Sequence, residues 1–144
     1  MTKTLLIALV IPAALAAGCG GPRHHGEMDP VKMDHRVTEH LEDYLDDAKA
    51  SDAQKARIRE VKSRLLPEGV ALAAANRKAG RELATALASD NPDPARLHAL
   101  IDQQLEATRA FAHKSLDGAL EAHRTLTPEQ RAPLTKKLRR YASR

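Results

Sequence analysis

Apolar residues recur at spacings of three and four along most of this chain, and this spacing places them on one face of an α-helix. The pattern predicts four amphipathic helices, at about residues 30–48, 52–88, 94–123 and 128–141, and no segment has the alternation of a β-strand. The apolar positions of the first and third helices are Val37, Leu41, Tyr44, Leu45 and Ala48, and Leu97, Leu100, Ile101, Leu105, Phe111, Leu116 and Leu120. We therefore predict an all-α fold.

Two prolines lie inside these predicted helices. Pro67 falls in the middle of the second helix, and Pro133 falls in the second turn of the last one. An interior proline removes one backbone hydrogen bond and costs about 3 kcal/mol unless the helix bends. We expect a kink or a short break near residue 67, and a bend or a late start in the last helix.

The N-terminal segment has the pattern of a secretory signal rather than of a folded element. Lys3 precedes a mostly apolar run from Leu5 to Ala17, which is too short to span a bilayer as a mature helix. Small residues then lead into Cys19, in an arrangement that resembles a bacterial lipobox, although Ala16 stands where Leu is usual. We favour a lipoprotein signal over an ordinary cleaved one.

This interpretation divides the chain into three parts. Residues 1–18 are predicted to be a lipoprotein-type signal peptide, residues 19–28 a flexible tether, and residues 29–144 one helical domain. Lipidation of Cys19 would anchor the protein in the periplasm, and Gly20 after it, by resemblance to enterobacterial lipoproteins, favours the outer membrane. A lipid anchor is then the only contact with the membrane that we expect.

Composition narrows the classes of function. Cys19 is the only cysteine, so no disulfide can form within one chain. With two Tyr, one Phe and no Trp, the core must be aliphatic and thin, and a second copy of the chain would help to cover it. The sequence has no Gly-rich phosphate loop and no nucleophile elbow, so we do not expect an enzyme. Export and the scarcity of aromatics argue against nucleic-acid binding.

The clearest local signal is the helix start Leu126-Thr127-Pro128-Glu129-Gln130. The Thr127 hydroxyl can cap the helix, Pro128 suits the first helical position, and Gln130 can bond back to the cap as a capping box. Ser51-Asp52-Ala53-Gln54 repeats the device in a weaker form, with Ser51 as the cap and Gln54 at the same offset. We interpret these residues as structural rather than catalytic.

Two such boxes in a short, exported, helical chain resemble the LTxxQ family of bacterial periplasmic proteins, which includes Spy, CpxP, ZraP and CnrX. The second box matches the family motif fully, and the first keeps Gln54 and a conservative Ser51. The resemblance implies an elongated four-helix hairpin with long bent helices that dimerises into a cradle. It also implies either binding of unfolded envelope proteins, docking on a sensor kinase, or metal sensing.

Metal binding is the main alternative to protein binding that the side chains offer. Imidazole suits zinc, nickel and copper, and thioether suits Cu(I). The candidate ligands lie in the tether and the first helix: His24, His25, Met28, Met33, His35 and His40. His35 and His40 are five residues apart, which turns them about 140° away from each other on a helix. We therefore favour surface residues and a tail over an ordered site.

The sequence leaves two hypotheses of different classes open. The first is an ATP-independent periplasmic chaperone or stress adaptor that holds unfolded proteins on an apolar, charge-rimmed helical surface. The second is a periplasmic sensor or binding protein for zinc, nickel or copper. A purely structural or partner-docking lipoprotein is a third. The acidic first helix could also meet the basic last helix, within one chain or across a dimer.

Overall fold

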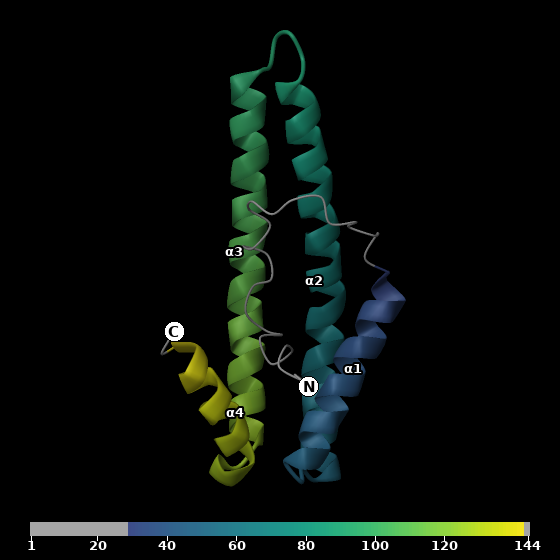
Figure 1. Cartoon of the computed structure of the whole chain (residues 1–144), viewed down its shortest axis with the longest axis vertical. Helices are drawn as coiled ribbons and strands as arrows, with labels where there is room; N and C mark the ends of the chain where they lie inside the picture. Colours follow the sequence, from purple (N-terminus) through teal and green to yellow (C-terminus); the bar gives the residue numbers. More distant parts are fainter. Residues whose placement is uncertain (1–28, 143–144) are drawn as a thin grey trace.

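The computed structural model describes residues 29–142, and every regular element in that range is an α-helix (Figure 1). The order along the chain is α1 (Pro30–Asp47), α2 (Asp52–Leu87), α3 (Pro94–Thr125) and α4 (Pro128–Ala142). The all-α fold predicted from periodicity is confirmed, and each helix begins at the residue that its capping signal indicates. Cys19, His24, His25 and Met28 lie outside the described residues.

A long antiparallel hairpin of α2 and α3 is the frame of the molecule (Figure 1). The 36 residues of α2 correspond to about 54 Å of helix, because each residue adds 1.5 Å. The loop at residues 88–93 closes one end of the hairpin. At the other end, which we call the base, α1 folds back along the outer side of α2 and α4 turns back outside α3. Near the loop the hairpin therefore consists of two helices alone.

Short polar side chains define the helix starts. The Asp29 carboxylate accepts hydrogen bonds from the backbone N–H groups of Val31 and Lys32, and Asp93 does the same for Ala95 and Arg96. A proline follows each of these two aspartates, in the position where a missing N–H removes no helical bond. The two capping boxes start the other two helices and are described below.

The main hydrophobic cluster is small and lies at the base, while Val61, Ala79 and Leu97 are buried further along the hairpin. Leu45 is fully buried at the base and packs with Ala50, Ile58 and Leu126, so that α1, α2 and the α3–α4 turn all contribute. Leu41, Tyr44 and Ala122 pack around this cluster and are partly buried. An aliphatic core of this size fits the low aromatic content, and it holds the four helices together only at one end.

Two glycines let α2 and α3 approach each other closely. A Cβ atom at Gly118 would lie 2.5 Å from Cδ1 of Leu65 and 3.0 Å from Cγ1 of Val61, which is closer than side chains tolerate. On the opposite helix, a Cβ at Gly69 would lie 2.9 Å from the Cζ of Phe111. Each glycine thus makes room for a bulky side chain of the other helix.

The expected break at Pro67 is absent, because α2 continues through it to Leu87. The contacts of Leu65 with Gly118 and of Gly69 with Phe111 lie on either side of the proline and hold both halves of the helix against α3. Pro67 and Ser63 are exposed, so the Ser63 carbonyl that loses its helical partner can bond to water. Tertiary packing here outweighs a local cost of about 3 kcal/mol.

The late start expected for the last helix is also absent. Helix α4 begins at Pro128 and runs through Pro133. Pro133 is the sixth residue of the helix and is exposed, so the one helical bond that it removes leaves a carbonyl near solvent. The capping box at Thr127 determines where the helix begins.

Ion pairs join α1 to α2 rather than to the basic last helix. Arg59 binds the Glu42 carboxylate through two nitrogens at 2.6 and 2.7 Å, and Lys62 lies 2.7 Å from Asp34. The Lys55 ammonium forms a third ion pair between these helices, with Asp46. Within one chain the acidic helix therefore meets basic residues of α2, and Figure 1 places α4 on the far flank of the hairpin.

Among residues 29–142, no helix combines the length and the hydrophobicity needed to cross a lipid bilayer.

Candidate functional site

The first capping box, at the start of α2, forms as its sequence predicts. The backbone N–H of Ser51 donates to Oε1 of Gln54 at 2.9 Å, and the backbone N–H of Gln54 donates to the Ser51 hydroxyl at 3.4 Å. The turn before it ends α1 with Lys49 at φ = 52°, a left-handed conformation that favours glycine. The Ala50 N–H then reaches the carbonyl of Leu45 at 2.9 Å, which closes the end of α1.

The second box, at the start of α4, has the same geometry. The backbone N–H of Thr127 donates to Oε1 of Gln130 at 2.9 Å, and the Gln130 N–H donates to the Thr127 hydroxyl at 3.3 Å. Pro128 is the first residue of the helix, and Leu126 is buried in the core at the base. A hydrogen bond from the Glu129 backbone N–H, and then one from the Thr127 side chain, lower the pKa of the Glu129 carboxyl.

The structure brings the two boxes into direct contact, which the sequence did not predict. Gln54 Nε2 donates to Oε1 of Gln130 at 3.0 Å, and Gln130 Nε2 donates to Oε1 of Gln54 at 3.1 Å. Each amide nitrogen donates its second hydrogen to a backbone carbonyl just before the other capping box. Gln54 Nε2 lies 2.8 Å from the Thr125 carbonyl, and Gln130 Nε2 lies 3.1 Å from the Lys49 carbonyl. We call this arrangement the glutamine pair.

Two further side chains support the glutamine pair. The Tyr44 hydroxyl donates to the backbone carbonyl of Gln130 at 3.2 Å, and burial raises the pKa of that hydroxyl. Arg131 donates to the carbonyls of His123 and Leu126 at 2.6 and 2.5 Å, where the last carbonyls of α3 have no helical partner. The base is thus a polar junction whose partners lie far apart in the sequence.

The candidate metal ligands within the described residues do not form a complete site. Met33 is half-buried, while His35 and His40 are exposed and, as predicted, do not share a face. The nearest carboxylate to His35 is Glu39, one helical turn further on, with His35 Nδ1 and Glu39 Oε2 4.0 Å apart. Within residues 29–142, no group of three or more His, Cys, Asp or Glu side chains is placed to hold a metal ion.

An uncovered apolar face runs along α3. Leu105, the most exposed member, has 60% of its surface accessible, and the other three range from 41 to 49%. We call these four residues the α3 stripe: Ile101, Leu105, Leu116 and Leu120. They belong to the predicted apolar pattern of this helix, but α2 is the main packing partner of α3. The helix therefore has a wider apolar surface than this neighbour covers.

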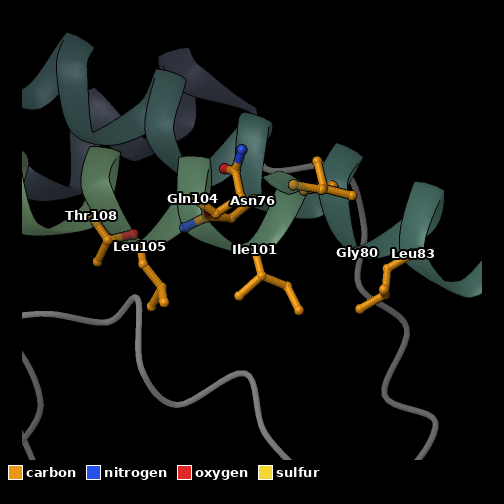
Figure 2. Close-up of a pocket in the computed structure, with 9 residues that line it drawn as sticks. Asn76, Gly80, Leu83, Ile101, Gln104, Leu105 and Thr108 are labelled. Atoms are coloured by element: carbon orange, nitrogen blue, oxygen red, sulfur yellow. The ribbon is translucent and has the colours of Figure 1, made fainter. Parts of the chain in front are cut away.

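Toward the loop end, the α3 stripe borders an open groove of about 270 Å³ between α2 and α3. Figure 2 shows Ile101, Leu105 and Leu83 projecting from the two helices on the same side. Gly80 leaves space, because a Cβ added there would meet no atom within 4 Å. Oε1 of Gln104 is buried in the groove and accepts no hydrogen bond from the described residues.

Comparison with known proteins gives one match. A family model described as heavy-metal resistance matches residues 3–133, which is nearly the whole chain. No curated protein and no solved structure matches this chain.

Proposed function

We propose that this chain, which belongs to the heavy-metal resistance family, is a periplasmic metal-responsive protein that binds zinc, nickel or copper. The observation that carries the proposal is the family match over residues 3–133. The concentration of His and Met between residues 24 and 40 agrees with it, because imidazole binds all three of these metals and thioether binds Cu(I). We further propose that Cys19 carries a lipid that keeps the protein at the outer membrane.

The donors within the described residues fit only part of such a site. His35 and Glu39 lie one turn apart on an exposed face of α1 and could supply two ligands. Zinc normally takes four ligands, so these two residues are insufficient alone. We infer that His24 and His25 supply the other two, and that Met28 is a further donor for Cu(I), since all three precede α1 by only a few residues in the sequence.

Calorimetric titration of the purified chain with zinc, nickel and copper tests this proposal. We expect saturable binding that is lost in the double variant His24→Ala/His25→Ala and weakened at least about tenfold in His35→Ala, since removal of one of four ligands costs more than 1.4 kcal/mol. His98→Ala is the matched control, because His98 is exposed near the other end of the hairpin. Equal binding by all of these variants, or no binding by the parent chain, would contradict the proposal.

A second candidate function rests on the α3 stripe. Exposed apolar side chains flanked by charged residues could hold unfolded envelope proteins without ATP, and Arg109 and Glu106 border the stripe as an ion pair at 2.7 Å. The same surface could dock on the periplasmic domain of a sensor kinase. Both partners belong to the chaperone or stress-adaptor hypothesis.

Light scattering of a chemically unfolded client distinguishes this second candidate. We expect the chain to suppress aggregation at a few-fold molar excess, and the variant Leu105→Ser/Leu116→Ser to lose that effect. Val31→Ser is the control, because Val31 is 76% exposed on α1 and lies outside the α3 stripe. Equal suppression by both variants would remove the stripe from the mechanism.

A further inference from the structure

Helix α4 is attached to the rest of the molecule near its start. Gln130 donates hydrogen bonds to Gln54 and to the Lys49 carbonyl. Arg131 donates to two carbonyls near the end of α3. Among the described side chains, every hydrogen bond between α4 and residues 29–126 involves one of these two α4 residues. Beyond them the helix diverges from α3 (Figure 1), so its later turns extend away from the hairpin.

These later turns of α4 are strongly basic. The helix has five basic residues and one acidic residue, so its net charge is +4, and the acidic residue, Glu129, lies in its first turn. Four of the five basic residues fall within residues 136–140. Lys136 and Arg139 are exposed and form no ion pair with a described residue. The part of α4 that extends from the hairpin therefore has a concentrated positive charge.

The opposite flank of the base has the opposite charge. Helix α1 has six acidic and two basic residues, and its net charge is −4 with histidine neutral. Figure 1 places α1 outside α2 and α4 outside α3, so the molecule is negative on one flank and positive on the other. A broad anionic surface attracts the α4 flank and repels the α1 flank. Such a surface would therefore bind this molecule in one orientation, with α4 toward it.

We propose that α4 docks on the surface of a bilayer that contains anionic phospholipid. In the sequence of this helix, Leu134, Leu138 and Tyr141 recur at spacings of four and three among the basic residues, a pattern typical of helices that lie in a membrane interface. Such an interface offers phosphates to basic residues and acyl chains to apolar ones, whereas an acidic protein surface need offer only the negative charge. The contact is separate from the proposed metal site, and it needs no lipid on Cys19.

Vesicle binding by the full chain tests this contact. The partition coefficient is measured by co-sedimentation with vesicles of phosphatidylcholine alone, and with vesicles in which part of it is replaced by phosphatidylglycerol. We expect tighter binding to the anionic vesicles at about 0.1 M salt, where the screening length is about 10 Å. The variant Lys136→Gln/Arg139→Gln should bind them at least about tenfold more weakly, because each basic residue near an anionic surface strengthens binding about fivefold.

The chain offers a matched control. Lys78 and Arg81 have the same spacing and are exposed on α2 toward the loop end, far from α4. The variant Lys78→Gln/Arg81→Gln removes the same charge and should change binding less than about twofold, because its site lies beyond the screening length. The variant Lys136→Arg/Arg139→Lys keeps the charge of α4 and should bind like the parent. All of these chains share one N-terminal segment, so differences between them do not arise from it.

Two further measurements complete the test. Raising the salt to about 0.5 M should abolish the preference for anionic vesicles, because the screening length falls to a few ångströms. Circular dichroism checks the helix content, and Lys136→Ala/Arg139→Ala replaces the glutamine variant if that variant loses helix. Equal partition of the parent chain into both kinds of vesicle would overturn the proposal. Equal weakening by the α4 and α2 substitutions would also overturn it, because net charge rather than α4 would then determine binding.

Discussion

Gln54 and Gln130 hydrogen-bond to each other through both of their amide groups, at 3.0 and 3.1 Å, although 76 residues separate them in the chain. Each amide has two donor hydrogens and an oxygen that accepts two bonds, and all of these are used. The same side chain thus completes its own capping box and fixes the turn before the other box. Glutamine suits both positions because its amide can make both sets of hydrogen bonds at once.

Substitution of one glutamine of the pair should leave polar groups of the other without hydrogen-bond partners. In Gln54→Ala, Gln130 loses a donor and an acceptor in a half-buried place, and the Thr125 carbonyl loses its partner. We expect a loss of about 1–3 kcal/mol in the free energy of unfolding, and a double-mutant cycle with Gln130→Ala should give a coupling of about 1 kcal/mol or more. Urea denaturation measures both quantities. Gln103→Ala, on the exposed side of α3, is the control, and additive effects would contradict the pairing.

Thr127→Ala tests the second capping box by itself. The substitution removes the hydroxyl that accepts from the Gln130 N–H and should lower stability by about 1 kcal/mol. Thr127→Ser retains the hydroxyl and should recover most of that loss. If thermal melting showed no change while metal or client binding disappeared, Thr127 would have a functional role instead of a structural one.

Lys49→Gly should stabilise the protein. Lys49 has a left-handed backbone at φ = 52°, which costs a residue with a side chain about 1–2 kcal/mol. Glycine avoids this cost but loses about 0.4–1 kcal/mol through the greater freedom of the unfolded chain. We expect a net gain of about 0.5–1 kcal/mol in chemical denaturation. Lys49→Ala, which keeps the unfavourable conformation, should show no such gain.

The glycines of the hairpin provide a matched pair of substitutions. Gly80→Ala should stabilise α2 by up to about 1 kcal/mol, because alanine favours the helix and the new methyl group meets nothing. Gly118→Ala gains the same preference but forces its Cβ against Leu65 and Val61, and overpacking costs about 1–3 kcal/mol. Thermal melting should therefore shift in opposite directions. A stabilised Gly118→Ala would mean that α2 and α3 can separate at no cost.

Acid should destabilise the protein through its paired carboxylates. Arg64 and then Arg57 hold the pKa of Glu121 below its ordinary value of 4.5, and Arg59 lowers that of Glu42 in the same way. Because the unfolded chain binds these protons first, the stabilisation is complete above pH 4.5 and is lost as the pH falls below it. The urea midpoint should drop in that range. In Glu121→Gln the drop should be smaller, and an identical drop would contradict this assignment.

Local signals in the sequence were sufficient for the helices and their starts. The capping residues Asp29, Ser51, Asp93 and Thr127 act on backbone groups within three residues, and such effects do not depend on the rest of the fold. The resemblance to the LTxxQ family is likewise confirmed by the heavy-metal resistance match. The continuity of α2 through Pro67 could not be read from the sequence, because it depends on packing against α3.

Less of the candidate site could be predicted from the sequence. The boxes at Ser51 and Thr127 were found, but nothing in either one indicates that Gln54 and Gln130 meet. The metal ligands were chosen by residue type, and Glu39 was missed although its spacing of four from His35 places both on one face. Exposure of Leu105 and Leu116 depends on how many neighbours α3 has, and an apolar pattern does not reveal that number.

The glutamine pair adds to the contacts that determine the register between α2 and α3. Phe111 packs against Gly69 and Leu65 packs against Gly118 along the hairpin, and the covalent loop at residues 88–93 restrains the far end. A slip of a single turn, about 5.4 Å, would pull the two amides beyond bonding distance and leave four hydrogen bonds unmade. The two helices of the hairpin are therefore joined at one end by the peptide chain and at the other end by hydrogen bonds between two side chains.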